Sequence, residues 1–250
     1  LLKLWCHEQS RVIRDRLVNE EDRDWFNITV SKMLKDHLDV EWDVDMFKDV
    51  LWGDYESKEG GVYKQIESVD NKLPEILDEY LEEYNVTFPT TMELVFFRDA
   101  IMHLSRIARI LRQPRGNALL VGVGGSGRKS LTRLACFVAD IKCISIEITR
   151  GYGVTEWRED LKRLLMTAGA ENKEVVFLFS DTQIVMESCL EDINNLLNSG
   201  EVPNLFEPEE KDSIVEACRK RCKASGIVDT RDNVLAYFVQ CVRENLHIVL

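Results

Sequence analysis

The sequence lacks several features that would place it in a special class of proteins. It has no run of about 20 apolar residues, which is the length that a membrane-spanning helix needs. Only 5 of its 250 residues are proline, which excludes a collagen-like or low-complexity chain. The chain starts with Leu1 instead of an initiator methionine, and its charged first residues do not form a signal peptide. We therefore expect a globular piece of a longer protein, with no membrane partner.

The cysteines lack the spacing of a disulfide framework or a zinc site. There are 7, an odd number, with no Cys-x-x-Cys pair and no histidines at zinc-finger spacing. Cys218 and Cys222 lie one helical turn apart, but no second pair completes a metal site. Most cysteines stand beside apolar residues, so we expect small buried thiols in a reducing compartment, the cytoplasm.

Basic residues are too few for a nucleic-acid-binding protein. The chain has 44 acidic and 32 basic residues, a formal net charge of −12. Residues 41–83 alone contain 14 acidic residues and 4 lysines. Because binding to a phosphate backbone needs a basic face, we exclude nucleic acid as the main partner. A local basic pocket for a single phosphate group is still compatible with this composition.

The first half of the chain has the hydrophobic periodicity of helices. Apolar residues recur at a spacing near 3.6 in four segments, and glycines at 53 and 60–61 interrupt the acidic stretch between them. The predicted helices span residues 1–17, 20–38, 67–84 and 92–111. We interpret 1–52 as a small all-helical subdomain, 53–91 as an acidic linker and helix, and 92–250 as the main domain.

From residue 117 onward, short apolar strands alternate with helices. The predicted strands are 117–121, 143–148, 175–179 and 246–250, and the predicted helices are 130–140, 155–167, 186–197, 212–224 and 230–244. This order is typical of an α/β domain whose parallel sheet has helices on both faces. Residues 246–250 read as a central strand. Residues 117–121 read as a short buried strand with an open apolar edge.

A glycine-rich loop joins the first of these strands to its helix. Glycines let backbone N–H groups curl around an anion, and the N-terminus of the helix adds the positive end of its dipole. Gly122 and Gly127 have the spacing of the phosphate-binding motif G-x-x-x-x-G-K-[ST]. However, Arg128 stands in the lysine position and Lys129 in the Ser/Thr position. The loop therefore predicts a modified phosphate site.

The two replacements change the expected chemistry. Arg128 keeps a cation near the phosphates, but its forked guanidinium does not copy an ammonium group. Lys129 removes the hydroxyl that would ligate Mg²⁺, and Ser130 lies about 100° further round the helix axis. Lys129-Ser130 could instead be aligned with the Lys-Ser pair of the motif, but Arg128 would then take the place of the second glycine. We therefore prefer the alignment in which Gly127 is the second glycine. A glycine turn with no ligand is the alternative.

The end of the third predicted strand supplies the second part of the site. Asp181 follows residues 175–179, where an aspartate would hold Mg²⁺ through water. The alternative, a helix N-cap or turn residue, is less favoured because Asp181 follows the third strand after the glycine loop. Thr182 stands where a catalytic base would be expected and cannot accept a proton from water. Gln183 would point the wrong way to orient that water. We expect a site that binds nucleotide and hydrolyses it poorly. Its predicted residues are Gly122, Val123, Gly124, Gly125, Ser126, Gly127, Arg128, Lys129, Ser130 and Asp181.

Taken together, these segments resemble a known family. The resemblance rests on NALLVGVGGSGRKSLTRLA at 117–135, FLFSDTQ at 177–183 and LEDINNLLNSGEVPNLF at 190–206. It is to the fourth AAA+ unit of a dynein heavy chain of the axonemal type. LWCHE at 4–8, with Arg11 and DRL at 15–17, resembles the helical lid that closes the preceding, third unit.

The resemblance implies roles for individual residues. Residues 122–128 would be the Walker A loop and Asp181 the Walker B aspartate. Arg11 would lie near the sensor-2 position of the preceding unit, or else be a solvated arginine on a helix face. It also implies an auxiliary unit that binds ATP or ADP, with Mg²⁺ held weakly through Asp181. The fifth strand, the arginine finger and this unit's own lid would follow Leu250.

For the whole protein, the resemblance implies an ATP-driven microtubule motor in the axoneme of a cilium or flagellum. Its partners would be the neighbouring AAA+ units of the same heavy chain, the dynein intermediate and light chains, and microtubules. The unit would relay nucleotide-dependent motion to the stalk, and the 250 residues alone would be inactive. Two other functions remain open. A free-standing P-loop ATPase or phosphotransferase would need a catalytic base and an in-register Lys-Ser/Thr, whereas a structural scaffold would bind no nucleotide.

Overall fold

The computed structural model describes residues 1–47, 50–56, 61–66, 69 and 72–250. Contacts divide the chain into two compact units, 1–106 and 107–250. The division falls inside helix α4 (Arg98–Leu111), which contributes residues to both units. The domain boundaries expected after residues 52 and 91 remain predictions.

The first unit consists mostly of helices. Its elements are α1 (Leu2–Val12), a 3₁₀ turn (Arg14–Arg16), α2 (Glu20–Leu38), a second 3₁₀ turn (Val44–Phe47), β1 (Trp52–Gly53), β2 (Lys64–Gln65), α3 (Lys72–Thr87) and the start of α4. β1 and β2 pair in antiparallel fashion, which the sequence did not predict. α1 ends five residues before the predicted end at 17. Residues 67–68 and 70–71, where the third helix was expected to start, lie outside the described residues.

A small core holds α1 and α2 together. α2 begins at the N-cap Asn19, whose side-chain oxygen accepts a hydrogen bond from the backbone N–H of Asp22 at 2.8 Å. The apolar face of α2 then packs against α1 and the segment that follows α2. The buried residues of this cluster are Cys6, Phe26, Val30, Leu34, Trp42 and Val50.

Helix α4 begins at Arg98 instead of at the predicted residue 92, because the side chain of Asn85 holds Met92 in a non-helical position. The Asn85 oxygen accepts from the Met92 N–H at 2.7 Å, and its nitrogen donates to the Met92 carbonyl at 2.9 Å. Asn85 lies near the end of α3, so a contact between two elements sets this boundary.

The second unit alternates helices with a parallel sheet. After α4 come α5 (Arg128–Val138), β3 (Lys142–Ile144), α6 (Val154–Leu165), a π-helix (Met166–Ala170), β4 (Val175–Leu178), a 3₁₀ turn (Asp181–Gln183), α7 (Glu187–Asn198), α8 (Pro208–Ala224), α9 (Arg231–Asn245) and β5 (Leu246–Val249). β3 is shorter than the predicted strand 143–148. α8 begins four residues earlier than predicted, because Pro208 occupies its first turn and Glu210 accepts the backbone N–H of Glu207.

The sheet has the parallel order β3-β4-β5. Residues 118–120 extend it beyond β5 through a single parallel bridge and hydrogen bonds of 2.8–2.9 Å that join Ala118 and Leu120 to Ile248 and Leu250. The predicted strand 117–121 is thus reduced to a short extended segment. The last predicted strand lies between the first and the third, as expected.

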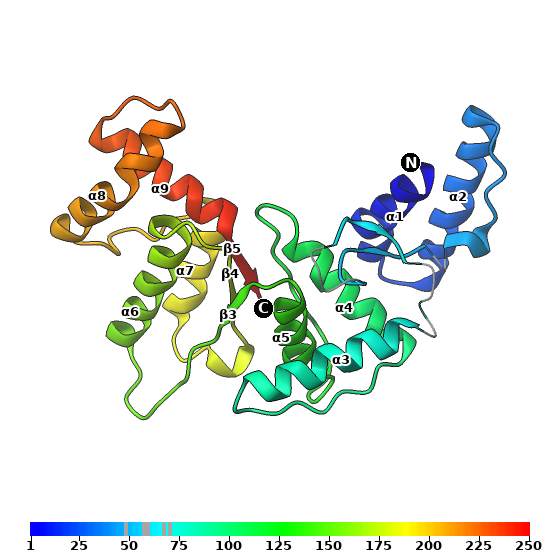
Figure 1. The fold of residues 1–250 in the computed structure, drawn as a ribbon, viewed down its shortest axis with the longest axis horizontal. Coiled ribbons are helices and arrows are strands. Elements are labelled where there is room, and N and C mark those ends of the chain that lie inside the picture. Colours follow the sequence, from blue (N-terminus) through cyan, green and yellow to red (C-terminus); the bar gives the residue numbers. More distant parts are fainter. Residues whose placement is uncertain (48–49, 57–60, 67–68, 70–71) are drawn as a thin grey trace. The chain divides into compact units, whose positions relative to one another are not determined.

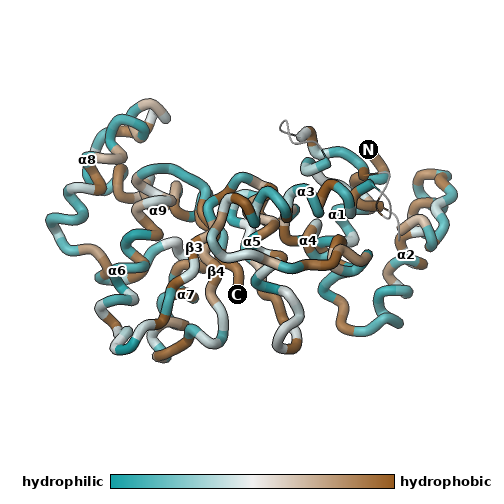
Figure 2. The backbone as a smooth tube through the Cα atoms, turned by 60° about the horizontal axis from the view of Figure 1, so that its bottom comes forward, coloured by the Kyte–Doolittle hydropathy of each residue, from teal (hydrophilic) through white to brown (hydrophobic). Residues whose placement is uncertain are grey.

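Helices cover both faces of this sheet. In Figure 1, α5 lies on one side of the strands, and α6 and α7 lie on the other. Every residue of β4 and β5 is buried, which confirms the prediction of a central strand at 246–249. The backbone around β4 is correspondingly hydrophobic in Figure 2. The main core includes the ring cluster of Trp157, Phe177 and Phe179.

Unlike β4 and β5, the segment 117–121 at the outer side of the sheet is not buried. Leu119 is 72% exposed and Val121 is 86% exposed, so the prediction that 117–121 is buried is wrong. Within the part of the chain that the structure describes, this segment pairs only with β5, so the prediction of an open apolar edge is confirmed there.

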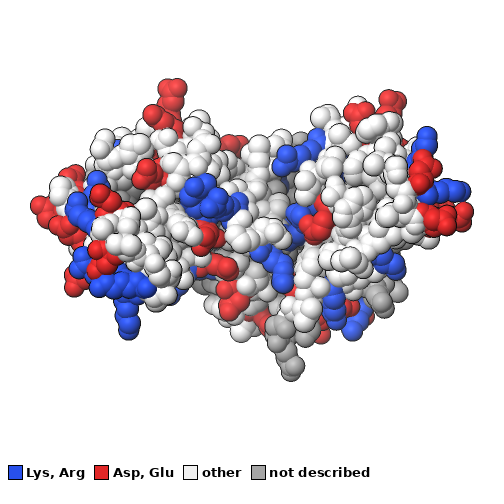
Figure 3. Space-filling view, turned by 90° about the horizontal axis from the view of Figure 1, so that it is seen from above, with Lys and Arg blue, Asp and Glu red and all other residues white. Residues whose placement is uncertain are grey.

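Charged residues of both signs lie on the face of the molecule that Figure 3 shows. On the face drawn in Figure 3, lysines and arginines alternate with acidic residues over the part of the chain that the structure describes. Among the described residues, no helix combines the length and the apolar character that crossing a bilayer would require.

Candidate phosphate-binding site

The predicted site residues gather at the carboxyl-terminal ends of the strands. The loop at 122–127 follows the segment 118–120, and Asp181 comes three residues after the end of β4. Both follow the carboxyl ends of parallel strands, where ligands of open α/β sheets bind. Only β5 lies between these two strands, and neighbouring strands are about 4.8 Å apart. The structure therefore brings Asp181 and the loop to the same end of the sheet, after two strands that are about 10 Å apart.

The backbone of the loop has the form of an anion cradle. Gly125 and Gly127 have φ angles of 78° and 76°, in the left-handed region that glycine adopts without strain. A side chain at Gly124 or Gly125 would meet no atom within 4 Å, so the outer surface of the loop is open. Gly127 is the N-cap of α5 and has no side-chain hydrogen bond to the first turn. The first N–H groups of α5 are therefore suited to a phosphate group.

Arg128 is folded back against this loop. Its guanidinium donates to the carbonyl of Leu120 at 3.1 Å and to the carbonyl of Val123 at 3.2 Å. The aliphatic part of Arg128 passes beside Gly122, where a Cβ would lie 3.6 Å from its Cδ, an ordinary contact distance. The arginine thus holds the two ends of the loop together. Lys129 is exposed beside it, and Ser130 is half-buried.

Asp181 is exposed and makes a local contact. Its Oδ1 accepts the backbone N–H of Thr182 at 2.9 Å, and the hydroxyls of Thr182 and Ser180 lie 3.0 Å apart. Within the described ranges, no group of three or more His, Cys, Asp or Glu residues could hold a metal ion. With Lys129 in the place of the hydroxyl ligand, the residues present fit a phosphate group better than they fit Mg²⁺.

Gln183 is a part of the site whose role the sequence did not reveal. Its Oε1 accepts from the backbone N–H of Ser180 at 2.7 Å and from the Ser180 hydroxyl at 3.0 Å. Its Nε2 donates to the Ser145 hydroxyl at 3.1 Å and to the carbonyl of Ile146 at 2.5 Å. The side chain is buried and ties the end of β4 to the segment after β3. Its amide is therefore engaged by the fold and does not face an attacking water.

Arg11 lies in the first unit. Its Nε is 3.3 Å from Oδ2 of Asp15, and the same oxygen lies 3.0 Å from Nε of Arg106. The side chain of Arg11 is only 8% exposed, so the alternative of a solvated arginine is wrong. Its expected place near a preceding nucleotide site stays a prediction.

Comparison with known proteins places the chain in a family. Residues 92–250 match the family described as "P-loop containing dynein motor region D4". The whole chain is 48% identical to "Dynein axonemal heavy chain 6" of Homo sapiens and 49% identical to "Dynein axonemal heavy chain 1" of Rattus norvegicus. It is 45% identical to "Dynein-1-beta heavy chain, flagellar inner arm I1 complex" of Chlamydomonas reinhardtii.

Each of these alignments covers 100% of this chain but only 6% of the relative. The matched family region contains the glycine loop, α5, β4 and Asp181, so the observed site lies inside the P-loop region. The chain therefore belongs to the axonemal dynein heavy chain family, and its residues 92–250 are the P-loop motor region D4.

Proposed function

We propose that this region is an auxiliary nucleotide-binding unit, which binds ADP or ATP through residues 122–130 and hydrolyses it little or not at all. The observation that supports it best is the pairing of an intact anion cradle with an amide, Gln183, that is fully engaged in structural hydrogen bonds. The cradle supplies backbone donors for phosphate. No side chain at 181–183 is arranged as a general base.

The weakness of the hydrolytic part has two separate causes. Lys129 cannot ligate Mg²⁺, which normally neutralises charge that develops on the phosphates during transfer. Thr182, in the position of a base, is hydrogen-bonded to Ser180 and has no acidic group. In this proposal, bound nucleotide has a structural or regulatory role.

A second candidate, a scaffold that binds no nucleotide, is supported by Arg128. Its guanidinium already bonds the carbonyls of Leu120 and Val123, so a phosphate group would compete with existing hydrogen bonds. We favour binding because the open outer surface of the loop and the free start of α5 do not depend on this arginine.

Isothermal titration with ADP, with and without excess Mg²⁺, tests the proposal. We expect weak binding whose affinity changes less than about threefold when Mg²⁺ is added, because the hydroxyl ligand is missing. A strong Mg²⁺-dependent increase would contradict our account of Lys129. No binding at all would support the scaffold.

Two glycine variants locate the binding. Gly125→Ala and Gly226→Ala each put a Cβ on an open glycine of positive φ, 78° and 76°. Both should cost similar stability, about 1 kcal/mol. Only the first should weaken ADP binding, and equal weakening by both variants would place the nucleotide elsewhere.

For the longer protein, we propose the functions that its family implies. The unit would relay conformational change between neighbouring AAA+ units of the heavy chain and the microtubule-binding stalk. The intermediate chains, light chains and microtubules would be partners through that protein, in the axoneme of a cilium or flagellum. We further propose that residues 1–52 include the end of the preceding unit's helical lid.

A further inference from the structure

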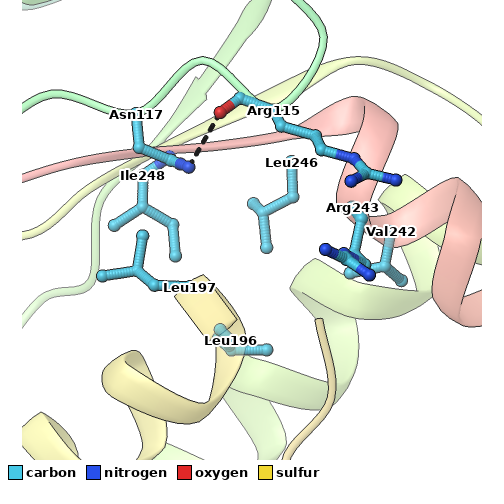
Figure 4. A pocket seen from close by; sticks show the side chains of 8 residues that line it. All are labelled: Arg115, Asn117, Leu196, Leu197, Val242, Arg243, Leu246 and Ile248. Atoms are coloured by element: carbon cyan, nitrogen blue, oxygen red, sulfur yellow. Dashed lines mark hydrogen bonds between the residues drawn. The ribbon is translucent and has the colours of Figure 1, made fainter. Parts of the chain in front are cut away.

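A small cavity lies near the amino-terminal ends of the strands, at the opposite end of the sheet from the glycine loop. It has a volume of about 90 Å³ and is lined by side chains from the loop before residue 118, the end of α7, the end of α9 and β5. Figure 4 shows the lining residues, which are Arg115, Asn117, Leu196, Leu197, Val242, Arg243, Leu246 and Ile248. Asn117 and Gly122 are five residues apart along an extended segment, so the two sites are separated by about 17 Å. The cavity is therefore distinct from the phosphate-binding site.

The cavity has an apolar floor and two cations at one end. Figure 4 places both guanidinium groups at the end near Val242, away from Leu197. Among the described residues, neither Arg115 nor Arg243 forms a hydrogen bond or ion pair through its guanidinium. Other arginines of this unit, such as Arg163, do pair with aspartates. Two unneutralised cations on one cavity favour an anionic ligand.

The polar amide in the lining is held by the backbone on both sides. The oxygen of Asn117 accepts the backbone N–H of Ile248 at 2.7 Å, and its nitrogen donates to the carbonyl of Arg115 at 3.1 Å. The arginines are thus the groups that would recognise a ligand.

The fold makes specific room for Arg243. Gly200, just after α7, has a φ of 81°, and a Cβ there would lie 2.3 Å from the Cγ of Arg243. The aliphatic part of the arginine therefore rests on the bare backbone of Gly200. This packing sets the position of the guanidinium at the rim.

The size and chemistry of the cavity select a small class of ligands. A cavity of about 90 Å³ holds a few water molecules and cannot enclose a nucleotide or an aromatic ring. Guanidinium groups bind carboxylates through paired hydrogen bonds, while the leucine and valine side chains favour methylene groups. We propose that this cavity binds a carboxylate on a two-carbon aliphatic stem, either a free short-chain acid or the side chain of a glutamate in another protein segment.

Methyl NMR of the 250-residue chain tests the proposal with two matched pairs of probes. Propionate is compared with propionamide, and acetyl-glutamate amide with acetyl-glutamine amide. We expect the acids to shift the methyl signals of Leu196, Val242 and Ile248, and the neutral amides to bind at least about tenfold more weakly. If propionate alone binds, the ligand is a free acid, whereas binding of acetyl-glutamate amide identifies a protein side chain as the source.

Three variants connect binding to the arginines. Arg115→Gln and Arg243→Gln should each weaken binding of the acid about tenfold or more, and Arg163→Gln, the control at an exposed arginine, should leave it unchanged. Arg243→Lys keeps the charge but loses the paired N–H groups, and it replaces Arg243→Gln in this test if that variant does not fold. The proposal is overturned if no acid shifts these methyl signals, if the amides bind as well as the acids, or if the arginine variants bind normally.

Discussion

At the scale of single residues, polar side chains at the end of β4 serve the fold instead of catalysis. Gln183 is the clearest example, because all its hydrogen bonds go to Ser180, Ser145 and the carbonyl of Ile146. A glutamine near the end of such a strand could in principle orient a water molecule. Its burial and its partners show that here it joins two neighbouring strands at their carboxyl ends.

Gln183→Ala should therefore lower stability. The substitution leaves the N–H of Ser180 and the carbonyl of Ile146 without their partners, which should reduce the free energy of unfolding by about 1–3 kcal/mol. Urea denaturation measures this change. Gln240→Ala is the matched control, because Gln240 makes one exposed hydrogen bond to Glu244, and it should change stability by less than about 0.5 kcal/mol. Equal effects of the two variants would show that Gln183 does not stabilise the junction between β4 and the segment after β3.

Thr182→Glu alone should produce no measurable ATPase activity. It would supply a carboxylate at the position of the missing base, but Lys129 would still lack a metal-binding hydroxyl. An arginine from a neighbouring unit, which can be worth several orders of magnitude in rate, would also be absent. Phosphate release is the measurement, with the unmodified chain as its reference. Steady turnover by the single variant above that reference would disprove the prediction.

At the scale of elements, local pattern predicted the second unit better than the first. The strand at 246–249 and helix α7 follow from apolar periodicity, and α9 also follows from its N-cap Thr230, which is adjacent in sequence. The start of α4 does not, because it depends on Asn85 of another helix binding Met92. In the phosphate-binding site, too, local sequence predicted one part and contacts within the folded chain determine the other. Glycine spacing predicted the loop, whereas the inward fold of Arg128 depends on carbonyls that only the folded loop presents.

The π-helix after α6 is another element that sequence periodicity did not show. Gly169 lies within it, and a Cβ at this position would be 2.4 Å from a ring carbon of Phe238 in α9. Arg221 of α8 donates to the carbonyls of Gly169 and Ala170 at 2.9 and 2.6 Å. The π-helix is therefore the place where α8 and α9 pack closely against the segment that follows α6.

Gly169→Ala should destabilise the second unit by about 1–3 kcal/mol, because the added methyl group overpacks this contact. Thermal unfolding followed by circular dichroism measures the loss. Gly124→Ala is the control, since its Cβ would meet no atom within 4 Å and its midpoint should stay close to that of the unmodified chain. A normal midpoint for Gly169→Ala would mean that α9 adjusts to the methyl group without cost.

At the scale of the whole molecule, one side of the sheet ends in an apolar segment, residues 118–121, whose outer side pairs with no strand among the described residues. The N–H groups of Ala118 and Leu120 point to β5, so the alternate N–H groups of Leu119 and Val121 point away from the sheet. Their side chains are 72% and 86% exposed. An exposed apolar strand edge invites pairing with another chain.

We therefore expect the 250-residue chain to self-associate through this edge, and we expect charge placed on the edge to oppose it. Leu119→Lys combined with Val121→Lys should lower the apparent mass in static light scattering at matched concentration, because two like charges on facing edges repel. Val228→Lys replaces an apolar residue that is 70% exposed in the loop between α8 and α9, and it should leave association unchanged. If all the variants associate equally, another surface holds the copies together. If the unmodified chain is a stable monomer, this edge is not adhesive, despite its exposed leucine and valine.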